Sequence, residues 1–154
     1  GPGEFLLTLA ARFDRVLAVD VSTEMLERAR GRVRDAGLGN VELRQGELAP
    51  DEPVTGPFDA VVCAMVLHHV PRPDELVARC AGLLDEGGCL LVAELCPHVQ
   101  PWTREACGDV WPGFDPDQLR GYAEAAGLIR GPSQFLAQRN GFRIQLQRFE
   151  RRPA

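Results

Sequence analysis

Lysine is absent from this sequence of 154 residues, and all 17 of its basic residues are arginines. The absence of lysine excludes catalysis through a lysine Schiff base and a phosphate-binding loop built on a lysine. The formal net charge is −5, and the arginines are scattered along the chain. Because neutralising phosphates requires clustered cations, we expect neither nucleic acid nor an anionic membrane surface as a partner.

Long apolar runs and metal-binding cysteine motifs are also missing. The longest strongly apolar stretches, 58–70 and 89–95, are too short to span a bilayer, and the chain opens without the basic segment of a signal peptide. The five cysteines are odd in number and form no CxxC motif, which predicts free thiols in a reducing cytoplasm and no metal site. One alternative stays open: Cys96 and Cys107 are soft ligands suited to a metalloid or a soft metal ion, although their spacing matches no known metal site.

What the sequence does contain is a regular alternation of strand-like and helical segments. Its length fits one domain, and we expect residues 1–154 to form a single domain. The alternation predicts βαβ units and therefore an α/β fold, a Rossmann-like parallel sheet with helices on both faces. We expect strands at 15–21, 41–44, 58–65 and 89–94, and helices at 4–12, 22–37 and 73–84.

The last third of the sequence has a different character. Residues 95–114 hold three prolines and both tryptophans, so we expect an excursion of loop or short helix on the substrate side. A helix follows at 115–126. The partly alternating segments 134–137 and 142–149 predict a C-terminal antiparallel hairpin with one solvated face.

Chemistry-bearing residues stand at successive strand ends, where ligands bind in open α/β sheets. Gly1 and Gly3 precede the first helix, whose free amides suit an anionic group. Asp20 ends the first expected strand and is placed to accept both hydroxyls of a ribose. Glu47 follows the second strand and lies next to an apolar residue. Its carboxylate is placed to accept the amino group of an adenine. Each residue alone also fits a solvated loop or turn, but their joint placement predicts a nucleoside site.

Five segments together carry a resemblance to a known family: GPGEFLLTLA, VLAVDVSTEML, QGEL, FDAVVCAMVLHHV and LLDEGGCLLVAEL. In this order and spacing, over residues 1–95, they resemble the class I S-adenosylmethionine-dependent methyltransferases of the ubiquinone/menaquinone type. The tail resembles the methyltransferase half of bacterial regulators that carry an arsenic-repressor-type winged-helix domain. Family members also carry an acid-x-Gly-x strand end just before the position of Gly1. We therefore expect an N-terminally truncated domain without its first strand.

The resemblance implies S-adenosylmethionine as the cofactor and assigns residues to its parts. Gly1 and Gly3 would face the methionine part, and Asp20 would hold the ribose diol. The remaining expected contacts surround the adenine and line the methionine end: Val21, Met25, Gly46, Glu47, Leu48, Ala64 and Met65.

Catalytic residues are harder to predict from the sequence than cofactor-binding residues. The methyl donor is already activated, and a general base is needed only if the acceptor must lose a proton. His69 at the sheet edge and His98 on the excursion are the candidate bases. Packing in the cofactor pocket is the plain alternative for His69, as it is for His68, and an exposed loop position is the alternative for His98. The excursion also carries three aromatic residues that form either a wall over the acceptor or a satellite core: Trp102, Trp111 and Phe114.

The function expected from these features is methyl transfer to a small-molecule acceptor by a bacterial, cytoplasmic enzyme, with a homodimer as one possible assembly. A second hypothesis is a non-catalytic domain that senses S-adenosylmethionine or S-adenosylhomocysteine and controls an attached DNA-binding domain. A third, an NAD-type dehydrogenase domain, is disfavoured because no substrate domain follows and the edge hairpin suits a methyltransferase.

Overall fold

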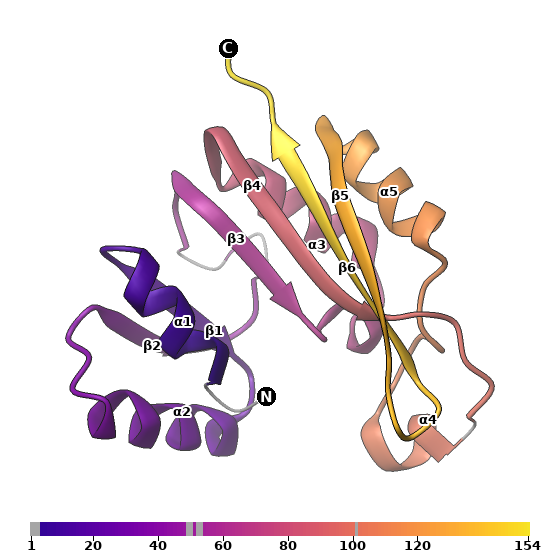
Figure 1. Ribbon diagram of the computed structural model, residues 1–154, viewed down its shortest axis with the longest axis horizontal. Helices are drawn as coiled ribbons and strands as arrows, with labels where there is room; N and C mark the ends of the chain where they lie inside the picture. The colour runs from indigo at the N-terminus through magenta and orange to yellow at the C-terminus, as the bar shows by residue number, and fades with distance from the viewer. Residues whose placement is uncertain (1–3, 49–50, 52–53, 101) are drawn as a thin grey trace. The chain divides into compact units, whose positions relative to one another are not determined.

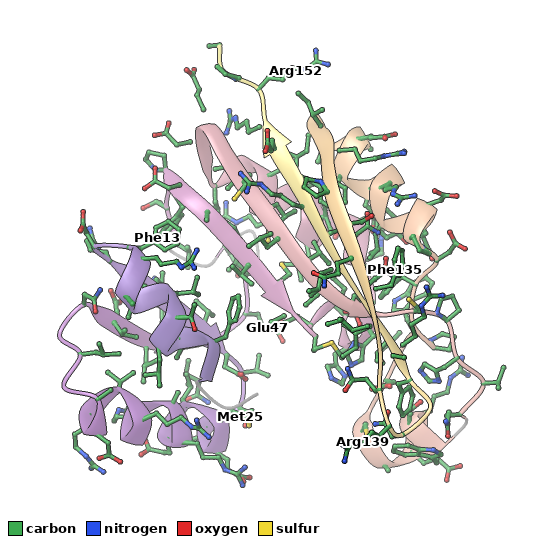
Figure 2. All side chains as sticks on the ribbon, in the orientation of Figure 1. Phe13, Met25, Glu47, Phe135, Arg139 and Arg152 are labelled. Carbon is green, nitrogen blue, oxygen red and sulfur yellow. The ribbon has the colours of Figure 1, made fainter. Side chains whose placement is uncertain are left out.

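The computed structural model describes residues 4–48, 51, 54–100 and 102–154 (Figure 1). Contacts within the chain divide it into two compact units, Gly1–Pro53 and Val54–Ala154, and each is described by itself. Side chains fill the space between strands and helices within each unit (Figure 2). The predicted site residues Gly1 and Gly3 lie outside the described residues.

The first unit alternates helices and strands in the order α1 (Glu4–Arg12), β1 (Val16–Asp20), α2 (Thr23–Asp35) and β2 (Val41–Gln45). β1 and β2 pair in parallel, with Val16 opposite Val41 and Asp20 opposite Gln45. The predicted βαβ unit is therefore confirmed, and the carboxyl ends of both strands lie at the same edge of the sheet.

Local sequence signals set the bounds of α2. The Ser22 hydroxyl accepts a hydrogen bond from the Met25 amide at 3.2 Å, so Ser22 is the N-cap. Leu26 and Ala29 form the buried stripe of the helix. The chain leaves the helix at Gly37, whose φ of 66° is a left-handed conformation that glycine adopts without steric cost.

The second unit holds a four-stranded sheet in the order β3-β4-β6-β5. β3 and β4 are parallel, while β6 is antiparallel to both of its neighbours, as predicted for the C-terminal hairpin. α3 and α5 contact each other, and Figure 1 shows α3 behind the strands. In chain order the elements are β3 (Phe58–Ala64), η1 (Leu67–His69), α3 (Pro73–Gly82), β4 (Leu84–Leu95), α4 (Trp102–Cys107), α5 (Pro116–Ala125), β5 (Leu128–Ala137) and β6 (Arg143–Arg151).

Two strands are longer than predicted. β5 begins at Leu128 rather than at residue 134. β4 begins at Leu84 rather than at residue 89 and continues through Gly87 and Gly88. The register explains this difference: Phe58 pairs with Leu84 and Ala60 with Cys89, so β4 carries extra residues in a bulge between these pairs.

β1 and β3 are less buried than expected for strands of a parallel sheet with helices on both faces. All five residues of β1 are half-buried, and only Cys63 of β3 is fully buried. β1 pairs only with β2, and β3 only with β4, so within the described residues each strand has one edge without a strand partner. An unpaired edge is the physical reason why these strands remain accessible.

The buried face of β6 is unexpectedly polar. Gln145 and Gln147 are buried, although the predicted hairpin was expected to bury apolar residues. The Gln145 side-chain amide donates to the Phe114 carbonyl at 2.7 Å, and the Gln147 amide donates to the Gln145 side-chain oxygen at 2.7 Å. These hydrogen bonds satisfy the buried amides and attach the end of the excursion to the sheet.

Candidate functional site

The carboxyl ends of β1 and β2 bring the two predicted acids to one edge of the first unit. The Gly46 amide donates to the Asp20 carbonyl at 3.1 Å, and Glu47 is the next residue. The Asp20 Oδ1 atom accepts from the Ser22 amide at 2.8 Å, so the turn into α2 orients this carboxylate. The side-chain amide of Gln45 donates to the Thr23 hydroxyl at 3.0 Å and ties the end of β2 to the same turn.

Apolar surface adjoins these acids. Val21 follows Asp20 directly and is 59% exposed, which is unusual for a branched aliphatic side chain. Met25 in the first turn of α2 and Leu48 after Glu47 are half-buried (Figure 2 labels Met25 and Glu47). Carboxylate oxygens beside exposed apolar side chains match the needs of a nucleoside, which has an apolar ring face and polar edges.

The end of β3 carries the two remaining predicted cofactor residues, in the second unit. Met65 has a φ of 58°, which a residue other than glycine adopts at a cost. Its amide donates to the Ala93 carbonyl on β4 at 2.8 Å. Ala64 is exposed and Met65 half-buried, so the backbone at this strand end is accessible to a ligand.

Directly after this turn, His68 makes a buried contact with Glu94 at the end of β4. His68 Nδ1 lies 2.5 Å from Glu94 Oε1, and the Glu94 side chain is fully buried. The Leu95 amide also donates to Oε1, at 2.8 Å, and the His68 amide donates to Oε2, at 3.3 Å. Burial lowers the pKa of His68, but the hydrogen bond to Glu94 and the negative charges of Glu94 and Asp109 outweigh it, so the pKa is raised.

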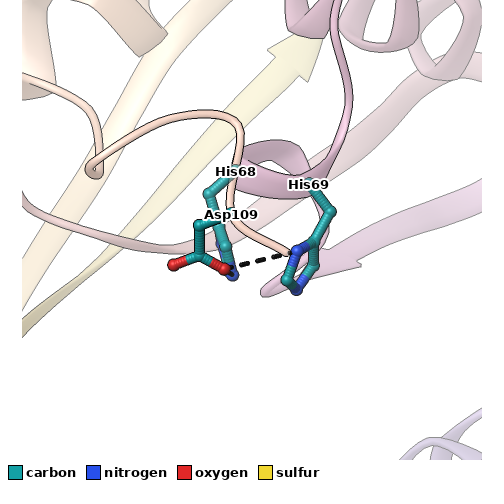
Figure 3. A group of neighbouring side chains, drawn as sticks. All are labelled: His68, His69 and Asp109. Carbon is teal, nitrogen blue, oxygen red and sulfur yellow. Dashed lines mark ion pairs between the residues drawn. The ribbon is translucent and has the colours of Figure 1, made fainter. Parts of the chain in front are cut away.

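Asp109 of the excursion completes a cluster with both adjacent histidines (Figure 3). Its Oδ1 atom lies 3.4 Å from His69 Nδ1 and 3.6 Å from His68 Nε2. The Asp109 side chain is 4% exposed, and its Oδ1 has no hydrogen-bond partner among the described residues. The amides of Val110 and Trp111 both donate to the His68 carbonyl, at 2.9 and 3.1 Å, and hold the excursion against η1.

His98, the other candidate base, is not part of this cluster. Its Nδ1 atom accepts from the Gln100 amide at 3.2 Å, so the neutral ring carries its proton on Nε2. That Nε2 is buried without a hydrogen-bond partner among the described residues. The ring borders a pocket of about 290 Å³ lined by His98, Val99, Gln100, Thr103, Arg104 and Pro112.

The aromatic residues of the excursion differ in burial. Phe114 is fully buried, and its ring centroid lies 5.6 Å from that of Trp111 and 6.4 Å from that of Tyr122. Phe114 is therefore part of the core. Trp102 is 49% exposed and contacts Phe142 edge-on. It therefore presents a face that is available to a ligand.

Sequence reasoning missed Glu94 and Asp109. Glu94 had a usable signal, because an acid inside the apolar run 89–95 must be buried and therefore paired. No sequence signal pointed to Asp109, because its position near the histidines depends on how the excursion folds. Cys96 is buried and Cys107 is exposed, and neither belongs to a cluster of metal-ligating side chains among the described residues, so the structure does not support the soft-metal alternative.

Comparison with known proteins identifies the family to which this chain is similar. The family described as "Methyltransferase domain" matches residues 1–88. A ubiquinone biosynthesis O-methyltransferase of Xylella fastidiosa is 35% identical over 98 residues, 62% of this chain and 39% of that protein. One of Paracidovorax citrulli is 32% identical over 138 residues, 87% of this chain and 56% of that protein. The chain thus spans well under two thirds of these relatives.

Solved structures of low sequence identity share the fold. The N-methyltransferase NodS of Bradyrhizobium japonicum, solved with S-adenosylhomocysteine, has a TM-score of 0.76 at 19% identity, over 97% of this chain and 73% of that one. The [4+2]-cyclase SpnF has a TM-score of 0.81 at 16% identity, over 100% of this chain and 72% of that one. The predicted Rossmann-like α/β fold is confirmed, although a cyclase among the neighbours shows that the fold alone does not fix the reaction.

Among the described residues, no helix has the length and apolarity needed to cross a membrane. Residues 1–88, more than half of the chain, match the family, and relatives above 30% identity agree with it. The chain belongs to the methyltransferase-domain family, the class I S-adenosylmethionine-dependent methyltransferases.

Proposed function

We propose that this chain binds S-adenosylmethionine at the ends of β1, β2 and β3 and transfers its methyl group to a small-molecule acceptor. The observation that carries the proposal is the pair of carboxylates, Asp20 and Glu47, at the adjoining ends of two parallel strands in a chain of this family. The proposed cofactor residues are Gly1, Gly3, Asp20, Val21, Met25, Gly46, Glu47, Leu48, Ala64 and Met65.

The residues at this edge fit the nucleoside part of the cofactor. One oxygen of Asp20 is engaged by the Ser22 amide, and the other has no partner among the described residues, so it is available to a ribose hydroxyl. Glu47 is exposed and is suited to accept the adenine amino group. Val21, at 59% exposure, supplies an apolar surface for the adenine ring. The bound cofactor supplies a methyl group on a positively charged sulfur, and the protein contributes alignment and a dry site.

The candidate bases have distinct proposed roles. His69 is 44% exposed at its side chain and lies 3.4 Å from Asp109 through Nδ1, an arrangement that orients the ring as a base. His98, which carries its proton on Nε2, is better suited to donate a hydrogen bond to an acceptor oxygen than to remove a proton. Both assignments apply only when the acceptor is a hydroxyl or another group that must lose a proton.

A hydroxyl acceptor is the first class to test, because the relatives are named as O-methyltransferases. We also propose that residues 1–154 form one methyltransferase domain, since the solved structures cover 97–100% of the chain. All five cysteines are free, which supports a reducing bacterial cytoplasm as the location.

The decisive experiment is calorimetric titration of the protein with S-adenosylhomocysteine and, separately, with NADH. We expect saturable binding of S-adenosylhomocysteine at one site and no binding of NADH. Incubation with methyl-labelled S-adenosylmethionine and phenolic acceptors then tests transfer. Binding of NADH in place of S-adenosylhomocysteine would contradict the cofactor assignment, whereas tight cofactor binding without labelled product from any acceptor would contradict the proposed activity.

A further inference from the structure

The arrangement of Asp109 between two imidazoles does not correspond to hydrogen bonding. The Asp109 Oδ1 atom lies 3.4 Å from His69 Nδ1 and 3.6 Å from His68 Nε2, whereas N–H···O hydrogen bonds span about 2.7–3.2 Å. This oxygen is buried and has no hydrogen-bond partner among the described residues. A buried carboxylate oxygen without a partner is costly, so something with positive charge is expected to satisfy it.

The distances correspond instead to ligands that share one metal ion. Two ligand atoms bound to a tetrahedral zinc ion at ~2.0–2.2 Å lie roughly 3.3–3.6 Å apart. The distances from Asp109 Oδ1 to the two histidine nitrogens, 3.4 and 3.6 Å, fall in this range. The ligand atoms of His68, His69 and Asp109 all lie within 4.8 Å of one another, so one ion can reach all three after a small adjustment.

The contact with Glu94 suits His68 to be a metal ligand. Because Glu94 accepts a hydrogen bond from His68 Nδ1, the neutral ring directs the lone pair of Nε2 toward Asp109. A lone pair facing a carboxylate oxygen is repulsive unless a metal cation or a proton lies between them. A carboxylate that holds the far nitrogen of a metal-binding histidine is a recurring outer-shell feature of metal sites, where it fixes the ring and raises its basicity.

We propose that His68, His69 and Asp109 bind one divalent transition-metal ion, with Glu94 as the outer-shell partner of His68. Two imidazoles and one carboxylate suit Zn²⁺ and related first-row ions better than Ca²⁺ or Mg²⁺. Three protein ligands leave one position open, which is typical of catalytic rather than structural zinc. The cluster can be reached from the side of His69, which is 44% exposed while the other two ligands are buried.

This proposal does not depend on methyl transfer, since it concerns metal binding alone. It does compete with one role proposed above. With a metal ion on Nδ1, His69 is a ligand and no longer a base.

The test is titration of chelator-treated protein with Zn²⁺ by calorimetry and with Co²⁺ by visible absorption. We expect one equivalent to bind and Co²⁺ to show the bands of a tetrahedral N/O site. His69→Ala and Asp109→Asn should each weaken Zn²⁺ binding more than Glu94→Gln, for which we expect a loss of roughly 10–100-fold. His69 is exposed enough that its alanine variant should fold, which circular dichroism would verify.

His98→Gln and Cys107→Ser are the matched controls, one for the remaining histidine and one for the exposed thiol. Both should bind Zn²⁺ like the wild type. The proposal fails if the wild type binds no stoichiometric Zn²⁺, in which case a proton on His68 satisfies Asp109. It also fails if His69→Ala and Asp109→Asn keep wild-type affinity, or if either control abolishes binding.

Discussion

Asp20 shows how one side chain can be fixed by local structure and still be available to a ligand. Its Oδ1 atom accepts from the Ser22 amide within the turn, which positions the carboxylate without neutralising it. A charged hydrogen bond to a ligand contributes about 1.5–3 kcal/mol. The proposed ribose contact therefore has a measurable size.

Asp20→Ala should weaken S-adenosylhomocysteine binding by roughly 10–100-fold, because the ribose hydroxyls lose a charged acceptor. Asp20→Asn removes the charge but keeps an oxygen that accepts from the Ser22 amide. Comparing it with Asp20→Ala therefore separates the effect of the charge from the effect of the hydrogen bond in the turn. Calorimetry measures both variants, with Asp14→Ala, an exposed acid before β1, as the control. Wild-type affinity in Asp20→Ala would remove the ribose assignment.

We expect the cysteines to differ in reactivity because they differ in burial and in pKa. The Cys63 and Cys80 sulfurs lie 3.5 Å apart in the core, and their hydrogen bond together with burial raises the pKa of Cys63 well above its usual value. Burial likewise raises the pKa of Cys96. Thiols that are buried and protonated react slowly, whereas Cys107 is exposed.

Native protein treated with a chromogenic disulfide reagent should therefore release one rapid equivalent, from Cys107, followed by slower reaction of the half-buried Cys89. Cys107→Ser should lose the rapid phase, and all five thiols should react after unfolding. A rapid phase that survives in Cys107→Ser would show that another thiol is more accessible than the structure indicates.

At the scale of elements, the excursion depends on close backbone packing at Gly113. This residue has a φ of 86°, and a Cβ atom there would lie 2.6 Å from the Cys96 carbonyl carbon and 3.0 Å from the Leu95 oxygen. All of these neighbours are backbone atoms, which cannot rotate away. Glycine is thus required where the excursion returns to the end of β4.

Gly113→Ala should lower the free energy of unfolding by about 2–4 kcal/mol, since strain at a positive φ adds to the overlap. Gly121→Ala, inside α5 with nothing within 4 Å of the added methyl group, should raise it by about 0.5–1 kcal/mol. Urea denaturation of the two variants gives the comparison. Equal effects would contradict the close approach at Gly113.

Helix bounds could be predicted from the sequence because capping residues are local. Ser22 and Asp115 cap α2 and α5, and Pro73 begins α3, at the starts of the predicted helices. The ends of β1 and β2, with Asp20 and Glu47, were predictable for the same reason. The cluster around His68 was not, because its partner Glu94 is 26 residues away and Asp109 arrives through the fold of the excursion. Such contacts depend on tertiary packing, which local patterns do not encode.

At the scale of the whole molecule, the proposed cofactor residues fall in both compact units. Asp20 and Glu47 belong to the first, and Ala64 and Met65 to the second. A ligand that binds only the folded protein stabilises it against unfolding, by about 2.7 kcal/mol at a concentration 100 times its Kd.

Saturating S-adenosylhomocysteine should therefore slow amide hydrogen exchange at residues 20–25 and 46–48 and also at residues 64–67. Exchange monitored by mass spectrometry measures all three segments at once. Peptides from β5, which carries no proposed cofactor residue, serve as the internal control. Protection limited to the first unit would exclude Ala64 and Met65 from the site.

The unpaired edge of β3 has a consequence for handling this chain in the laboratory. The strand reads FDAVVCA, with one charged residue in seven, and its outer row of amides and carbonyls has no strand partner among the described residues. Sparsely charged edges of this kind act as templates for strand addition by other molecules. Turbidity during concentration is thus to be expected from intermolecular sheet growth.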